Sequence, residues 1–170
     1  MQVYLRFQLT IVSQGTFYAA SKDSLVCPVD VRDIAAVAVA VLTGAGHEGK
    51  KYVITGPEAL TYFDVADKLS AAIGKKVSYV DVPLEVTKQA ILDTGEPEWF
   101  AEGQAEQFQF RWQGKQSWVT SAVADVAKKE PTGFDEFARE YRAYFRGETR
   151  AVAVQYRPRG DGRRTEKWIS

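Results

Sequence analysis

The stretch Val26-Cys27-Pro28-Val29-Asp30-Val31-Arg32-Asp33-Ile34-Ala35, with the apolar run that continues to Leu42, decides the fold predicted for this chain. A short β-branched segment, Val26 to Val29, leads into two carboxylates and an arginine, and an uncharged apolar run follows. Chains place such a run where neither side contacts water, because exposing that much apolar surface is costly. We therefore place this stretch in the middle of the fold.

The run Ile34 to Leu42 is predicted to be a buried helix that ends at Gly44. Its valines alternate with alanines, which would also fit a strand, but its start carries helix signals. Asp30 can cap the first turn, Asp33 occupies the capping-box position, and both carboxylates favour the positive end of the helix dipole.

Strand and helix signals alternate along the rest of the chain. Met1 to Ile11 is amphipathic and fits either a helix or a strand. The patterns predict strands at 15–18, 26–29, 51–55 and 77–82, a turn at 21–24, and helices at 61–73, 84–94, 98–113, 122–128 and 132–145. This order predicts an α/β fold with a parallel sheet, although a complete doubly wound sheet usually has more strands.

Composition and charge exclude several classes of protein. The 170 residues include 22 basic and 22 acidic side chains, so no net charge attracts nucleic acid or a membrane surface. Cys27 and His47 are the single cysteine and histidine, which excludes an internal disulfide and a metal cluster built from these residues. No apolar stretch reaches the about 20 residues that cross a bilayer, and Met1 to Thr10 does not resemble a signal peptide. We expect a cytoplasmic protein without metal, nucleic-acid partner or membrane.

The pattern of elements ends near Gly147. Five basic residues, prolines and glycines dominate the stretch from Tyr156 to Ser170. We therefore divide the chain into a folded part, residues 1–147, and a basic tail, residues 148–170, that is expected to be flexible.

Three matches to known motifs lack the context that their chemistry needs. Gly44 to Gly49 reads G-x-G-x-x-G, but a helix precedes it and a strand follows, which would place a phosphate at the negative end of a helix. Tyr18 and Lys22 have the Tyr-x-x-x-Lys spacing of short-chain dehydrogenases without helical periodicity around them. Arg159-Gly160-Asp161 is interpreted as a loop, and His47 as a surface residue.

Asp30, Arg32 and Asp33 form the best-marked polar cluster. In a functional interpretation, Arg32 contacts a phosphate of a cofactor or substrate. We favour a structural interpretation, an ion-paired helix start, because an arginine beside two carboxylates is already satisfied. Cys27 is interpreted as a small buried hydrophobe. No catalytic residue, cofactor-binding residue or metal ligand is assigned.

Several short motifs follow one another along the chain: Val29 to Ala35, Gly46 to Tyr52, Thr55 to Leu60, Leu69-Ser70, Val77 to Pro83, Gly95-x-Pro97-x-Trp99 and Pro131-Thr132-x-Phe134-x-Glu136-Phe137-Ala138. Together they resemble the NmrA-like group of atypical short-chain dehydrogenases/reductases. That group includes NAD(P)H:quinone oxidoreductases, triphenylmethane-reductase-like enzymes and redox-sensing regulators. The resemblance extends from about Gly15 to Phe145 and implies a Rossmann-like fold.

The resemblance also implies that this sequence supplies only the C-terminal portion of the family's fold. Met1-Gln2 resembles the interior of a family stretch, Phe-Met-(Glu/Gln)-Asn, although Val3 stands where the family usually has Asn. The dinucleotide-binding half precedes that stretch, so at least about 100 residues are expected to be missing. The expected fold class is α/β: a partial doubly wound parallel sheet with a helical, substrate-side C-terminal subdomain and no N-terminal dinucleotide-binding half.

The activity implied by the resemblance is hydride transfer from NAD(P)H to a quinone-like or related small acceptor, so the implied cofactor is NADP or NAD. Trp99, Phe100, Phe108 and Trp112 are candidates for the acceptor pocket, with packing in the core as an equal alternative. We expect a chain that does not bind the cofactor alone and is inactive alone. The alternatives are a non-catalytic redox-sensing regulator and a partner-dependent interaction module.

An open sheet edge is expected near Val26 and Lys51, where strands of the absent half would pair. We therefore expect the chain to form oligomers, to be poorly soluble, or to bind the missing N-terminal half.

Overall fold

The computed structural model describes residues 1–149 of the chain. Its sheet consists of two short parallel strands, β1 (Thr16–Ala19) and β2 (Ser78–Asp81), with Thr16 opposite Ser78 and Ala19 opposite Asp81. The connection between the strands runs through α2 (Val31–Thr43) and α3 (Tyr62–Ile73). The described part is thus a mixed α/β fold in which helices dominate, as expected from the alternating pattern.

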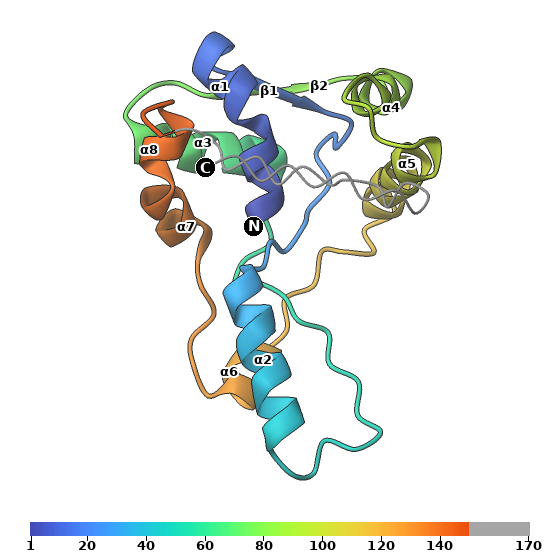
Figure 1. Cartoon of the computed structure of the whole chain (residues 1–170), viewed down its shortest axis with the longest axis vertical. Coiled ribbons are helices and arrows are strands. Elements are labelled where there is room, and N and C mark those ends of the chain that lie inside the picture. Colours follow the sequence, from blue (N-terminus) through green and yellow to red (C-terminus); the bar gives the residue numbers. More distant parts are fainter. Residues whose placement is uncertain (150–170) are drawn as a thin grey trace, which may run out of the picture.

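The core lies between the sheet, α3 and the helices at the two ends of the described chain (Figure 1). A 3₁₀ helix, η1 (Gln2–Phe7), continues directly into α1 (Gln8–Gln14), so the N-terminal segment that fitted either a helix or a strand is helical. Helices α7 (Phe134–Glu140) and α8 (Arg142–Phe145) pack against α3. The largest side chains that are fully buried here include Phe17, Leu69, Phe134, Phe137 and Phe145.

Two pairs of helices lie outside this core. Helix α4 (Leu84–Asp93) packs against α5 (Glu98–Trp112) on one side of the sheet. Helix α2 packs against α6 (Ala122–Ala127), and this pair extends away from the sheet (Figure 1). Of these two pairs, only the α4–α5 pair lies beside the small sheet, where α4 contacts β1.

Helix α3 has the boundaries that its sequence signals predict. The Thr61 Oγ1 atom accepts a hydrogen bond from the Asp64 backbone N–H (3.1 Å), and the Asp64 carboxylate accepts one from the Thr61 N–H (2.8 Å). Gly74 ends the helix with φ 69°, a left-handed conformation that glycine adopts at low cost. The predictions for β1, β2, α4, α5 and α6 are also confirmed, to within one residue at each end.

Two predicted strands are not formed in the described chain. Val26 makes only an isolated antiparallel bridge with Leu60, through N–O distances of 2.9 and 2.8 Å. Pro28 has no N–H to continue that ladder. Residues 51–55 are extended but have no neighbouring strand, and the Val53 carbonyl instead accepts a hydrogen bond from Thr120 Oγ1 (2.6 Å). Both predictions were wrong because a strand needs a partner as well as a suitable sequence.

Helix α2 forms as predicted, but the prediction that it is buried is wrong. Asp30 is its N-cap, and its side chain accepts a hydrogen bond from the Arg32 backbone N–H. Of its apolar side chains, Val37 is buried, whereas Ile34, Val39 and Leu42 are 40%, 60% and 84% exposed. The reason is that α6 covers one face and no element of residues 1–149 covers the other.

The last predicted helix differs in its start and in its continuity. Gly133, not Thr132, is the N-cap of α7, and the helix breaks at Tyr141 before α8 begins. The Thr132 side chain and N–H are instead bonded to Asp33. The predicted tail, residues 148–170, and Arg159-Gly160-Asp161 lie outside the described residues, apart from positions 148 and 149.

Candidate functional site

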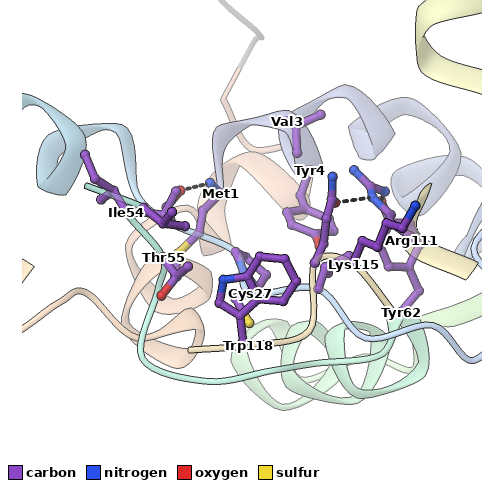
Figure 2. Close-up of a pocket in the computed structure, with 15 residues that line it drawn as sticks. Met1, Val3, Tyr4, Cys27, Ile54, Thr55, Tyr62, Arg111, Lys115 and Trp118 are labelled. Carbon is purple, nitrogen blue, oxygen red and sulfur yellow. Dashed lines mark hydrogen bonds between the residues drawn. The ribbon is translucent and has the colours of Figure 1, made fainter. Parts of the chain in front are cut away.

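A cavity of about 330 Å³ lies where η1 meets two extended segments and the chain that follows α5. In the close-up of Figure 2, Ile54 and Thr55 lie at one end and Arg111 and Lys115 at the other. The volume is at the lower end of the range for small-molecule sites, about 300–1,000 Å³. We take this cavity as the candidate site.

Apolar side chains form most of the wall of the cavity. They come from η1, from residues 26–29 and 53–54, and from the segment after α5: Met1, Val3, Val26, Val29, Val53, Ile54 and Trp118. Trp118 is half exposed and lies at the rim. An apolar wall with few polar groups is typical of sites that bind small organic molecules.

Two of these wall segments are held together at a glycine. The backbone of Gly56 lies directly against the carbonyl group of Pro28, so a Cβ at position 56 would overlap the Pro28 oxygen. Only glycine fits at this position, because any side chain would collide with the neighbouring backbone.

Arg111 is the most constrained polar group of the cavity. Its Nη1 donates to the Tyr62 hydroxyl (3.0 Å) and its Nε to Gln116 Oε1 (3.1 Å). Its guanidinium carbon lies 5.1 Å from the centre of the Phe108 ring, within the range of a cation–π interaction. These contacts fix the orientation of the guanidinium group.

The charge at this end of the cavity is positive. Lys115 also lines the cavity, and its Nζ lies 4.8 Å from the centre of the Phe110 ring. Within residues 1–149, neither Arg111 nor Lys115 forms an ion pair, and no carboxylate is among the residues that line the cavity.

Two weakly acidic groups of the cavity, the Tyr4 hydroxyl and the Cys27 thiol, have raised pKa values. Burial, reinforced by the neighbouring Tyr62, raises the pKa of Tyr4 well above its usual value. Burial also raises the pKa of the Cys27 thiol. Because the thiolate is the reactive form, Cys27 is a poor nucleophile at neutral pH.

The four aromatic residues predicted as pocket candidates do not line this cavity. Trp99 is 63% exposed and contacts Phe100 edge to face, while Phe108 is buried in the core beside the cavity wall. Trp112 lines a second cavity of about 340 Å³, and its Nε1 donates to the Ala20 carbonyl (2.8 Å). A direct role of these four residues in binding remains a prediction.

The predicted polar cluster does not reach the cavity either. Asp30 is fully buried, and Arg32 binds it through Nε and Nη2, both at 2.9 Å. Arg32 also contacts Glu140 at 2.7 Å. Hydrogen bonds from Arg32 lower the pKa of Asp30 and, reciprocally, raise the pKa of Arg32. Arg32 thus has two carboxylate partners, and a purely structural role of the cluster remains a prediction.

Asp33 connects α2 to the segment that leads into α7. Its carboxylate is fully buried and accepts hydrogen bonds from the Thr132 N–H (2.7 Å) and hydroxyl (3.2 Å), and it pairs with Lys129. It therefore does not close a capping box, because its oxygens are directed to a distant part of the chain.

The motif-like stretches lack the geometry that a dinucleotide needs. Gly44 to Gly49 follows the C-terminal end of α2 and is followed by extended chain, so no helix N-terminus faces it. Tyr18 lies in β1 and donates to Gln14 (2.9 Å), whereas Lys22 lies 3.9 Å from the centre of the Trp112 ring. Neither stretch therefore has the geometry of the motif that its sequence matches.

Two further classes of site are not found in the described part of the chain. No group of three or more histidine, cysteine, aspartate or glutamate side chains is arranged to hold a metal ion in residues 1–149. Among these residues, no helix has the length and apolar character needed to cross a membrane.

Arg111, Lys115 and Trp118 were not singled out in the sequence. Their signal is weak: two basic residues separated by four positions at the end of an aromatic helix, shortly before a tryptophan. Only the folded chain brings them to residues 26–29 and 53–55. A cavity formed by segments so distant in sequence cannot be read from local spacing.

Residues 19–138 match the NmrA-like family, and the chain belongs to that family. The family assignment made from the ordered motifs is therefore confirmed.

The chain is similar to several curated oxidoreductases. It is 39% identical over 145 residues to the NAD(P)H azoreductase of Xenophilus azovorans, covering 85% of this chain and 51% of the relative. It is 31% identical over 99 residues to quinone oxidoreductase 2 of Escherichia coli, covering 58% and 35%. The chain spans about half the length of the azoreductase that it matches.

The chain is also similar to solved structures of NADPH-dependent reductases. The NADPH-dependent quinone oxidoreductase QOR2 of E. coli superimposes with a TM-score of 0.74 and 25% identity, over 82% of this chain and 50% of that one. The triphenylmethane reductase of Citrobacter sp., in complex with NADP(H), superimposes with a TM-score of 0.71 and 25% identity, over 82% and 49%. The described fold is thus similar to about half of an NAD(P)-binding reductase.

Proposed function

We propose that this chain is the acceptor-binding part of an NmrA-like, NAD(P)H-dependent reductase whose hydride acceptor is a planar, quinone-like or azo compound. The observation that carries the proposal is the cavity between η1, α5 and residues 26–29 and 53–55. It has apolar walls, tyrosine hydroxyls and a fixed guanidinium group, and it lies in a fold similar to half of a quinone oxidoreductase.

The role of the chain in this reaction is to bind and orient the acceptor. Its apolar wall would exclude water from the acceptor ring, and Arg111 could donate hydrogen bonds to a carbonyl oxygen as negative charge develops there. Neither Tyr4 nor Cys27 supplies a base, because both are held neutral at physiological pH.

The cofactor is proposed to be held by residues other than those described. The relatives are named for NAD(P)H or NADPH, but the glycine-rich stretch 44–49 lies at the wrong end of a helix. We therefore propose that these 170 residues alone do not bind the dinucleotide and do not turn over.

The test separates binding of the acceptor from turnover. The purified chain is incubated with NADPH and a panel of quinones and azo compounds, and the loss of nicotinamide absorbance is followed, with E. coli quinone oxidoreductase 2 as the positive control. We expect no turnover, no NADPH binding by calorimetry, and saturable binding of the acceptors alone. Turnover at enzymatic rates contradicts the cofactor claim, and absence of acceptor binding contradicts the proposed site.

The exposed face of α2 favours a second candidate function, a module that binds another polypeptide. Val39 and Leu42 on α2, and Val53 in the neighbouring extended segment, are all more than half exposed. Such side chains mark surfaces for association. A chain that binds a polypeptide partner but no planar acceptor would favour this candidate over the reductase.

A further inference from the structure

We propose that the cavity selects planar aromatic ligands that carry an anionic group, a carboxylate or a sulfonate, with Arg111 and Lys115 binding the anion. This inference rests on the proposed function, since it takes the cavity as the acceptor site, and it adds the charge of the acceptor. The evidence for the inference is the distribution of charge in the cavity.

The first argument is the uncompensated positive charge. Both cations line a mostly apolar cavity, no carboxylate shares its wall, and neither cation is ion-paired within residues 1–149. By contrast, Arg6, Arg32 and Lys68 each contact a carboxylate within 3.0 Å. Arg111 is partly buried, so water screens its charge less and its attraction for an anion is stronger, whereas Lys115 is exposed and adds a weaker, screened attraction.

The second argument is the number of donors that Arg111 has left. A guanidinium group has five N–H donors. Three are directed to protein acceptors: Nε to Gln116 (3.1 Å), Nη1 to Tyr62 (3.0 Å) and Nη2, weakly, to Gln107 (3.5 Å). One N–H on each terminal nitrogen is therefore without a partner in the described chain. A carboxylate or sulfonate can accept hydrogen bonds from these two remaining donors.

The third argument is the position of the cations relative to the apolar wall. Arg111 and Lys115 lie at one end of the cavity, and Cys27, Trp118 and Ile54 extend from them toward the other end (Figure 2). This arrangement matches a ligand with a flat apolar body and a charged group at one edge. A neutral ring would contact the apolar wall but would leave both cations without an anionic partner.

The test compares two rings that differ in one substituent. Anthraquinone sulfonate and hydroxymethyl anthraquinone are titrated separately into the whole chain, and binding is followed by tryptophan fluorescence and by protection of Cys27 from excess maleimide. The labelling is done at mildly alkaline pH, where enough of the thiol is ionised to react in the free chain. Cys27 is the single cysteine and lines the cavity, so its protection reports on this site. We expect the sulfonate to bind about tenfold more tightly than the neutral ring and to lose this advantage at high salt.

Variants then assign the preference to the two cations. Lys115→Gln is expected to weaken sulfonate binding about fivefold, as for an exposed ion pair, and Arg111→Met on the order of 30-fold, as for a hydrogen-bonded charge. Binding of the neutral ring should change little in Lys115→Gln. Lys75→Gln removes an exposed cation that does not line the cavity and should change nothing. Melting curves identify any variant that fails to fold. If Arg111→Met fails to fold, the Lys115→Gln variant alone is enough to test the role of the cations.

Each outcome decides one claim. Equal affinity for the two rings, with Cys27 protected by both, overturns the anion preference and leaves the acceptor site standing. A sulfonate preference that survives both variants and high salt also overturns the assignment. If neither ring protects Cys27, the acceptor site itself is wrong, and the proposed function fails with it.

Discussion

Asp30 is a fully buried carboxylate whose charge is stabilised by its neighbours. It accepts hydrogen bonds from the Arg32 side chain, the Arg32 N–H and Gln2, and these lower its pKa below the ordinary value of 3.8. A depressed pKa in the folded state means that the unfolded chain binds the proton first as pH falls. The contribution of Asp30 to stability is therefore complete above about pH 4 and is lost as pH falls below it.

We predict that Asp30→Asn lowers the free energy of unfolding at neutral pH by about 1–3 kcal/mol, because it removes charge-assisted hydrogen bonds from a buried site. The loss should shrink as pH falls below about 4, because the unfolded chain then binds a proton at Asp30 that the folded chain does not yet bind, so the ionised carboxylate contributes less to stability. Urea unfolding at a series of pH values measures both effects. Asp67→Asn is the control, since Asp67 is exposed and its partner Lys76 is 3.3 Å away. A loss independent of pH would contradict the role of charge.

At the scale of elements, the capping box of α3 depends only on neighbouring residues, so its contribution to stability can be tested by a substitution at Thr61. Thr61→Ala removes the hydrogen bond to the Asp64 N–H and should destabilise the chain by about 1 kcal/mol. Thr61→Ser retains the hydroxyl and should cost less than half of that. Denaturant unfolding of the two variants gives the comparison. Equal losses would show that the methyl group of Thr61, and not the cap, stabilises the helix start.

The difference between local and long-range contacts explains which elements could be predicted from the sequence. The boundaries of α3 depend on Thr61 and Gly74, which lie next to the helix, so reading them needs no knowledge of the fold. Residues 26–29 and 51–55 have strand-like sequences, but a strand forms only beside another strand, and the described chain supplies none there. The burial predicted for α2 was wrong for a related reason. Its apolar side chains indicate that another element should pack on the helix, but the sequence of the helix does not say which element that is.

The candidate site was less predictable than the fold. Arg111 is linked to Tyr62, 49 residues earlier in the chain, and the cavity also needs residues near Cys27 and Ile54. Aromatic residues on α5 were visible in the sequence, but whether a ring such as Trp99 faces a cavity or solvent depends on how α5 packs against α4. The family could be inferred because ordered motifs do not depend on these contacts.

At the scale of the whole molecule, the uncovered face of α2 predicts self-association. Val39 and Leu42 are 60% and 84% exposed, and burying them in a second copy would remove apolar surface from water. We predict that light scattering after size exclusion shows oligomers that weaken on dilution, and that the double variant Val39→Gln, Leu42→Gln shifts the chain toward the monomer.

Leu9→Gln is the matched control for this experiment. Leu9 is 76% exposed on α1, which lies at the far end of the molecule from α2 (Figure 1). Its replacement should leave the distribution of oligomers unchanged. A monodisperse monomer at all concentrations for the unmodified chain, or equal effects of the two sets of substitutions, would contradict the assignment to α2.

The contact between Gly56 and Pro28 limits how the cavity can vary. Any side chain at position 56 would push the Pro28 carbonyl away and separate two of the cavity walls. Changes in the size of an accepted ligand can therefore arise more readily at Trp118, a half-exposed side chain that lines the cavity, than at position 56. A library that aims to alter specificity should keep position 56 as glycine and vary position 118.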